Sequence, residues 1–295
     1  MALPVIDFPV QTPDGRTLLV QEAGDPGGVP VLFHNGTPCS RLLDPRDAEL
    51  ADRVGVRLLC YDRPGYGGSS RHEGRSVGDC AQDVRAIAAA LEIEQMAVYG
   101  ISGGGPHAIA CAALLEDLVP AVGVLASTAP WDAEGLDYLA GTGELNVEDV
   151  ELFFSDRAAA RAKCEAERIE FLEADIDAVV EAMRTLLSPV DAAALTGPLA
   201  DYLVAAMKLG LEPSADGWWD DGVAYLSDWG FDLTSIRTPV LLLHGRHDRF
   251  VPLSHGQWLA AHIPGCDARL TEDDGHLTLL PNHLHEVLAW LLARL

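Results

Sequence analysis

Basic side chains are scarce in this sequence of 295 residues. It contains 20 lysines and arginines against 45 aspartates and glutamates, which gives a formal net charge of −25. Binding to a nucleic-acid backbone or to an anionic membrane surface requires clustered positive charge, so we expect neither partner. The acidic excess favours repulsion between molecules in solution, and attraction of a cationic substrate remains a second interpretation.

Long apolar runs and paired cysteine motifs are also absent. No apolar stretch approaches the length of a membrane span, and the first residues, MALPVIDFPVQTPDGRTL, lack the basic and apolar regions of a secretory signal. The scattered cysteines include no C-x-x-C pair, so we expect reduced thiols in a cytoplasmic protein. The six cysteines are Cys39, Cys60, Cys80, Cys111, Cys164 and Cys266.

Strand and helix patterns alternate along the chain. Short, continuously apolar runs between helical stretches are typical of a mostly parallel sheet that is covered on both faces. The sequence therefore predicts the α/β class. The predicted strands are Val5–Phe8, Leu18–Ala23, Val31–His34, Val56–Asp62, Met96–Gly100, Ala121–Ser127, Val240–Gly245 and Ala268–Thr271.

Helical patterns fill the intervals between these strands. Ser76, followed three residues later by Asp79, predicts a helix start by side-chain capping. The ranges 102–115 and 284–295 are two further predicted helices. Residues 131–231 contain helical patterns but no clear strand, so we predict that they form a helical cap over the carboxyl ends of the strands. The core domain would then comprise residues 1–130 and 232–295.

The strongest chemical signal is the sequence Gly-Ile-Ser-Gly-Gly that begins at Gly100. It follows an apolar strand and precedes a small-residue helix, which is the context in which G-x-S-x-G marks a nucleophilic serine. A serine raised on such a sharp turn needs neighbours without side chains, and Gly100 and Gly104 meet that need. We therefore predict Ser102 as the nucleophile. A plain turn is the weaker alternative because a strand and a helix flank the motif. A phosphate loop is weaker still, because the P-loop lysine and the glycine spacing of a dinucleotide site are both missing.

The loop His34-Asn35-Gly36-Thr37-Pro38 follows a second predicted strand. A tetrahedral intermediate needs two N–H donors directed at its oxyanion. We predict the backbone N–H groups of Gly103 and Thr37 as these donors. His34 and Asn35, on the same loop, are predicted to contact substrate.

Two further loops supply a candidate acid and base. Asp248 follows the strand at Val240–Gly245, and His276 follows the last strand. The order Ser, Asp, His along the chain is the order found when an elbow carries the serine, so we predict Asp248 to orient His276 as the general base. A metal bound by Asp248 with His244 and His247 is the weaker alternative, because no second ligand cluster accompanies them.

Five motifs together resemble the α/β-hydrolase family over nearly the whole chain. They are HNGTP, DRPGYGGSS, GISGG, HGRHDRFVP and DGHL, in family order. The resemblance implies an eight-stranded sheet with a cap inserted after the sixth strand, and it implies that Arg63 and Tyr66 support the site from below. Asn35 departs from relatives in which the histidine is directly followed by glycine, which leaves the register of the loop donor open by one residue.

The expected reaction is hydrolysis of a small-molecule carboxylic ester through an acyl-enzyme, with no metal or organic cofactor. An aminopeptidase or amidase similar to proline iminopeptidases, a lactonase, a carbon–carbon hydrolase and a perhydrolase would use the same three residues, and a catalytically silent ligand-binding homologue is the non-enzyme alternative. Trp218 and Trp219 are the predicted substrate contacts in the cap. Its carboxylates, including Glu167 and Glu170, could bind a substrate ammonium, but a solvated helix face is the preferred interpretation. The sequence does not predict the oligomeric state.

Overall fold

One sheet of eight strands forms the centre of the molecule. The computed structural model describes residues 5–295 of the chain. The strands are β1 (Ile6–Gln11), β2 (Thr17–Gly24), β3 (Val29–His34), β4 (Val56–Tyr61), β5 (Ala97–Ile101), β6 (Val122–Leu125), β7 (Val240–Gly245) and β8 (Asp267–Thr271). They lie in the order β1-β2-β4-β3-β5-β6-β7-β8. Strand β2 is antiparallel to both of its neighbours and every other neighbouring pair is parallel, so the predicted fold class is confirmed.

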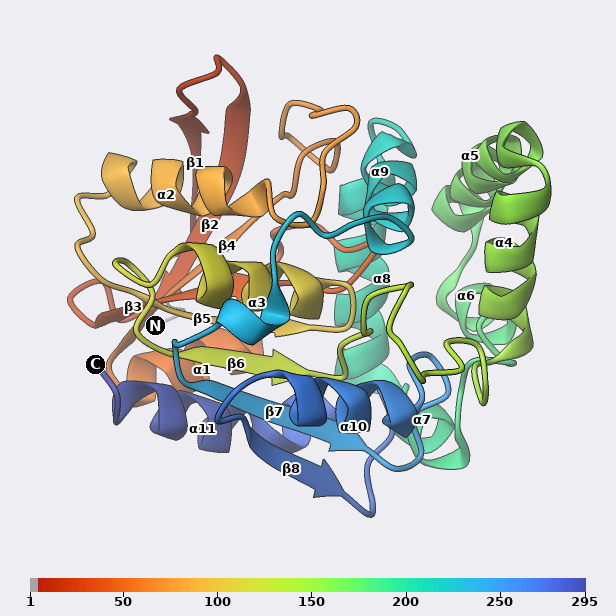
Figure 1. The fold of residues 1–295 in the computed structure, drawn as a ribbon. Helices are drawn as coiled ribbons and strands as arrows, with labels where there is room; N and C mark the ends of the chain where they lie inside the picture. The colour runs from red at the N-terminus through yellow and green to blue at the C-terminus, as the bar shows by residue number, and fades with distance from the viewer. Residues whose placement is uncertain (1–4) are drawn as a thin grey trace.

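Helices cover both faces of this sheet (Figure 1). The covering helices are α1 (Pro45–Arg53), α2 (Cys80–Ala90), α3 (Gly104–Leu114), α10 (Leu253–His262) and α11 (Leu279–Leu292). Helices α1 and α11 pack on one face, and α2, α3 and α10 pack on the other. Every residue of β6 and β7 is buried, as expected for strands that are covered on both sides. The sheet therefore has a separate apolar core on each face.

Two helices begin three or more residues away from their predicted starts. The amide and hydroxyl of Ser76 do donate to the Asp79 carboxylate, at 2.7 and 2.9 Å. The residues between them form a turn, however, and the regular helix α2 begins only at Cys80, so the predicted start was wrong. Helix α11 begins at Leu279, five residues before its predicted start, because its first turn continues directly from the loop after β8.

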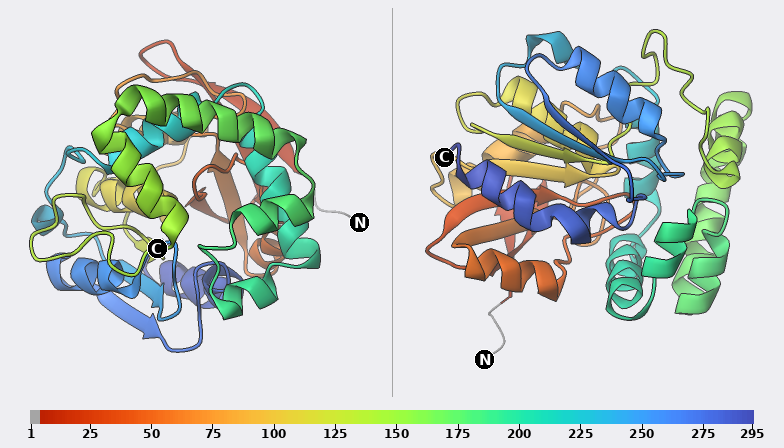
Figure 2. Two further views of the ribbon diagram at one scale, coloured as in Figure 1. Left: turned by 90° about the vertical axis from the view of Figure 1, so that its right-hand side faces the viewer. Right: turned by 90° about the horizontal axis from the view of Figure 1, so that it is seen from below.

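A long segment connects β6 to β7, and we call residues 126–239 the insertion. It contains α4 (Glu144–Ser155), α5 (Arg157–Glu173), α6 (Ile176–Ala182), α7 (Pro189–Ala194), α8 (Gly197–Leu211), α9 (Asp216–Tyr225) and the short 3-10 helix η1 (Leu233–Ser235). Figures 1 and 2 show α4–α9 gathered at the end of the sheet where the parallel strands terminate. The insertion thus lies over the edge at which ligands bind in open α/β sheets.

No helix among residues 5–295 is long and apolar enough to cross a membrane. Residues 1–4 lie outside the part of the chain that the structure describes. They belong to the predicted core domain and to the stretch for which we predict no secretory signal.

Candidate active site

Ser102 occupies the sharp turn between β5 and α3. Its φ is 55°, a left-handed conformation that costs a non-glycine residue about 1–3 kcal/mol. The turn is possible because its flanking glycines touch backbone: a Cβ on Gly100 would lie 2.2 Å from the Gly104 carbonyl oxygen, and one on Gly104 would lie 1.9 Å from that of His34. The left-handed backbone thus lies at the serine that the sequence predicts as the nucleophile.

Two backbone N–H groups next to Ser102 have no hydrogen-bond partner among residues 5–295. They belong to Thr37, in the loop after β3, and to Gly103, at the start of α3. The two residues are in contact, since a Cβ added to Gly103 would lie 2.3 Å from Thr37 Oγ1, and a Cβ added to Gly36 would lie 3.5 Å from Ser102 Cβ. Two free donors beside a serine are the arrangement that an oxyanion requires.

Asp248 and His276 form a buried pair at the ends of β7 and β8. His276 Nδ1 donates to Asp248 Oδ2 at 2.7 Å. The other carboxylate oxygen, Oδ1, accepts the backbone N–H groups of Phe250 and Val251 at 2.9 and 2.8 Å. The Phe250 ring stacks on the imidazole, with the ring centroids 4.6 Å apart. These contacts fix both the position of the imidazole and the tautomer that carries its proton on Nδ1.

A second carboxylate, Asp191 of the insertion, holds the loop that carries His276. It is fully buried, and it accepts the backbone N–H groups of His276 at 3.1 Å and of Leu277 at 2.8 Å. The Ser188 hydroxyl donates to it at 2.7 Å. No sequence signal predicts this residue, because nothing in the run Ser188-Pro-Val-Asp191 distinguishes it from an ordinary helix N-terminus.

The carboxylates around His276 favour its protonated form. Burial by itself lowers the pKa of His276, but the charge and hydrogen bond of Asp248, together with the charge of Asp191, outweigh burial and raise it above the usual 6.5. No hydrogen bond joins Ser102 Oγ to His276 among the described residues. Catalytic hydrogen bonds of this kind are often long in the absence of substrate.

A cavity of about 660 Å³ opens at Ser102 beneath the insertion. Its wall is mainly apolar, with contributions from Leu145, Phe171 and Met183, and it includes the predicted contact Trp218. Trp219 instead lines a smaller neighbouring cavity of about 190 Å³. The wall residues come from both the core loops and the insertion.

Three carboxylates, Asp149, Glu167 and Glu170, also line the large cavity. Glu167 therefore does not lie on the fully solvated helix face that was expected for the acids of the insertion. Burial raises the pKa of Glu167, and Lys163 Nζ lies 3.3 Å from its carboxylate. None of the residues that line the large cavity is a lysine or arginine.

His34 and Asn35 lie elsewhere than predicted, since neither lines the cavity. The Asn35 amide donates to the carbonyl oxygen of Ser40 and to the hydroxyl of Tyr202, each at 3.1 Å, and its oxygen accepts the Gly36 N–H. His34 is buried below the loop, where burial lowers its pKa well below 6.5. Both residues therefore shape the loop from within instead of facing a ligand.

His244, which belongs to the alternative metal site, and His283 each have partners of their own. Among residues 5–295 no group of three or more His, Cys, Asp or Glu side chains is placed to hold a metal ion. His244 is buried and its Nε2 donates to the Val251 carbonyl oxygen at 2.8 Å. His283, on α11, pairs with Asp274 at 2.8 Å.

This combination of fold, elbow and paired acid and base defines a hydrolase architecture, and comparison with known proteins agrees. Residues 29–282 match the family model described as alpha/beta hydrolase fold, and the chain belongs to that family. It is 28% identical over 271 residues to the AB hydrolase superfamily protein YisY of Bacillus subtilis (strain 168), covering 90% of this chain and 91% of that one. It is 25% identical over 261 residues to a bifunctional esterase/perhydrolase of Acinetobacter calcoaceticus, covering 82% and 83%.

A likeness to solved structures extends over the same length. The bromoperoxidase of Bacillus anthracis superposes with a TM-score of 0.73 at 20% identity, covering 98% of this chain and all of the other. This likeness shows the fold. Taken with the family match, it identifies the chain as a hydrolase.

Proposed function

We propose that this hydrolase cleaves small-molecule carboxylic esters through an acyl-enzyme on Ser102. The observation that carries the proposal is the strained Ser102, which lines an apolar cavity beside two N–H donors that have no partner within residues 5–295. In this proposal residues 131–231 act as the cap, and residues 1–130 and 232–295 act as the catalytic core.

The reaction would proceed in two acyl transfers. Ser102 Oγ attacks the ester carbonyl while His276 Nε2 takes its proton, and Asp248 stabilises the imidazolium that results. The Thr37 and Gly103 N–H groups bind the oxyanion of the tetrahedral intermediate. When the intermediate collapses, His276 protonates the departing alcohol. Water then attacks the acyl-enzyme with His276 again as base, which releases the acid and restores Ser102.

The cavity supports a neutral, largely apolar substrate. Lys163 pairs with Asp149 and Glu167 but lines the neighbouring cavity, so a substrate carboxylate in the large cavity would meet three carboxylates and no lysine or arginine. Anionic acyl groups are therefore expected to bind poorly. The same wall would tolerate an ammonium group. An amine-bearing ester or amide is therefore the second candidate, and it is the one that the three wall carboxylates favour.

Perhydrolysis is a third use of the same residues. Hydrogen peroxide would replace water as the group that attacks the acyl-enzyme, and the product would be a peracid. The relative named an esterase/perhydrolase supports this candidate, since the match covers more than four fifths of each chain.

Hydrolysis of p-nitrophenyl esters tests the proposal. Wild-type protein should cleave p-nitrophenyl butyrate, and Ser102→Ala should lose at least about 10³-fold in kcat. Equal rates in the two proteins would remove Ser102 from the mechanism. No cleavage by folded wild type would rule out the ester reaction.

A charge series on the acyl group tests the substrate class. The p-nitrophenyl esters of hexanoate, 6-aminohexanoate and adipate differ mainly in an end group that is neutral, cationic or anionic, and their chains are too long for rapid five-membered ring closure. We expect the adipate ester to have the lowest kcat/KM, and Glu167→Gln to reduce the difference in kcat/KM between the adipate and hexanoate esters. A preference of the wild type for the adipate ester would contradict the proposed substrate class.

A further inference from the structure

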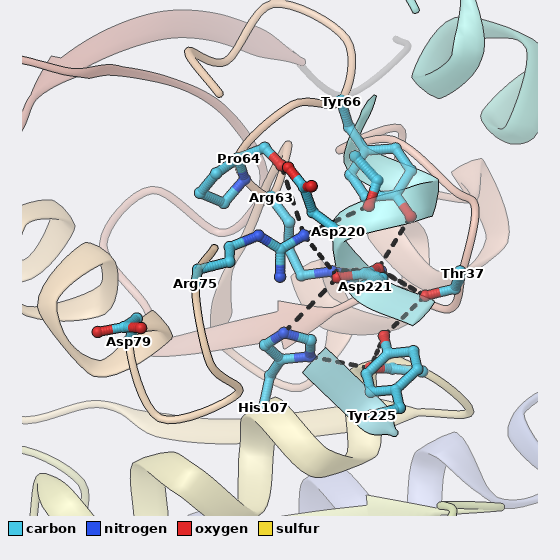
Figure 3. Close-up of polar contacts among 12 residues, drawn as sticks. Thr37, Arg63, Pro64, Tyr66, Arg75, Asp79, His107, Asp220, Asp221 and Tyr225 are labelled. Atoms are coloured by element: carbon cyan, nitrogen blue, oxygen red, sulfur yellow. Dashed lines mark hydrogen bonds and ion pairs between the residues drawn. The ribbon is translucent and has the colours of Figure 1, made fainter. Parts of the chain in front are cut away.

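A second buried carboxylate of the insertion, Asp221 on α9, lies beside Thr37 of the loop after β3 (Figure 3). Its Oδ2 accepts from Arg63 Nη2 at 2.7 Å, from Thr37 Oγ1 at 2.7 Å and from the Tyr66 hydroxyl at 2.9 Å. Its Oδ1 accepts from Arg75 Nη2 at 2.7 Å. One side chain of the insertion thus binds three separate segments of the core.

The cluster is charged and closed to solvent. Asp221 is fully buried, and Arg63 and Arg75 are nearly so. The arginines lower the pKa of Asp221 against the effect of burial, so the carboxylate is ionised, and two guanidinium groups against one carboxylate leave one net positive charge. His107, beside the cluster, adds no charge near neutral pH because burial lowers its pKa to about 3.

Arg63, which Asp221 binds, holds the backbone that carries the predicted oxyanion donor. Its guanidinium donates to the carbonyl oxygens of Asn35 and, at 3.3 Å, of Gly36, and also to Thr37 Oγ1 at 2.9 Å. The Gly36 carbonyl and the Thr37 N–H belong to one peptide group. A cation on that carbonyl polarises the peptide and makes its N–H a stronger donor.

Tyr225 extends the same contact to the second donor residue. It lies four positions after Asp221, so the two side chains share one face of α9. Its hydroxyl donates to the Gly103 carbonyl oxygen at 2.8 Å and lies 2.8 Å from Thr37 Oγ1. A single helix face therefore contacts both residues whose N–H groups are free.

We propose that Asp221 is a positioning residue of the oxyanion hole: it holds Arg63 and Thr37 so that the Thr37 N–H points at the developing oxyanion. The inference rests on the proposed function, because it assigns a role within that reaction. It gives α9 a part in the chemical step in addition to any part in covering the substrate. The alternative is that the ion pairs of Asp221 only stabilise the fold. In that case variant molecules that still fold correctly would keep the wild-type rate, whereas a positioning role predicts a lower rate per folded molecule.

The test uses Asp221→Asn and the matched pair Thr37→Val and Thr37→Ser. Valine keeps the N–H and the volume of threonine but removes the hydroxyl that joins Asp221, Arg63 and Tyr225, whereas serine keeps that hydroxyl. Active sites are counted by labelling with a fluorophosphonate to completion, and kcat for p-nitrophenyl butyrate is expressed per labelled site. Affinity for a trifluoromethyl ketone, whose adduct places an oxyanion in the hole, is measured in parallel.

We expect Asp221→Asn and Thr37→Val to lower kcat per labelled site by about 10- to 100-fold, with KM nearly unchanged. Ketone affinity should fall by a similar factor, and Thr37→Ser, which keeps the hydroxyl and loses only a methyl group, should lose clearly less of both quantities than Thr37→Val. Fewer labelled sites with an unchanged kcat per site would overturn the inference and leave Asp221 a purely structural role. If Asp221→Asn does not fold, the valine and serine pair decides. A wild type that neither labels nor cleaves ester would instead defeat the proposed function.

Discussion

The two ends of the candidate site are built with opposite charge. At the oxyanion end, the buried carboxylate of Asp221 is bound by two arginines, and the cluster has a net positive charge. At the base end, Asp248 and Asp191 are also buried, but their partners are backbone N–H groups, a serine hydroxyl and His276. No lysine or arginine pairs with either carboxylate within residues 5–295.

This difference matches the charges of the proposed intermediate. Attack by Ser102 would create an anion near Thr37 and a cation on His276. Positive charge at the first place and negative charge at the second stabilise that separation before the reaction begins, which is electrostatic preorganisation. The comparison predicts that variants at the base end shift the pH dependence of the rate, whereas variants at the oxyanion end lower the rate without shifting it.

The largest effect is expected from Asp248→Asn at the base end. The proposed reaction requires neutral His276, so wild-type kcat/KM should fall on the acid side through a raised pKa, above 6.5. The substitution should lower kcat by about 10³- to 10⁴-fold and move this acid limb to lower pH. A pH–rate profile from pH 5 to 9 measures both. A loss of only a few fold with an unmoved limb would mean that another acid orients the histidine.

Asp191→Asn is expected to have the next largest effect. Weakening two hydrogen bonds to a charged acceptor should misplace the His276 loop and lower kcat by about 10- to 100-fold. Its charge contributes to the raised pKa of His276, so the acid limb should also move to lower pH, by less than in Asp248→Asn. Asp175→Asn, a change at an exposed carboxylate of the same insertion, is the matched control. A wild-type profile in Asp191→Asn would assign this residue to folding alone.

Tyr225→Phe is a smaller change at the oxyanion end. It removes one hydroxyl that bonds the Gly103 carbonyl oxygen, so kcat should fall by about 2- to 10-fold. The acid limb should not move, because no charge near His276 changes. A clear shift of that limb would show that a change at the oxyanion end alters the pKa of His276.

The smallest effect is expected from His283→Gln. Like His276, His283 has a raised pKa, but it lies on α11, and its carboxylate partners are Asp274, at 2.8 Å, and Glu286, at 3.1 Å, instead of Asp248. The rate and its pH profile should therefore stay as in wild type. A substantial loss of kcat would make His283 a competitor for the role assigned to His276.

The parts of the site that sequence could predict are those encoded within a few residues. The elbow around Ser102 and the loops that carry Thr37, Asp248 and His276 each follow an apolar strand, and parallel strands bring their carboxyl ends to one edge. Asp191 and Asp221 could not be predicted in this way. Each acts on residues 85 or more positions distant, and neither differs in local sequence from the many other acids of the chain. Only the packing of the insertion selects them.

That packing has a consequence for how this enzyme could diverge. The insertion is anchored to the core at Asp191 and Asp221, yet α4 and α5, which form much of the cavity wall, contain no buried residue. Substitutions at such positions usually change stability by less than about 0.5 kcal/mol. New substrate preferences could therefore evolve, or be engineered, on α4 and α5 while α7 and α9, which carry Asp191 and Asp221, keep the catalytic geometry. Substrate specificity and catalytic rate could then change independently of each other.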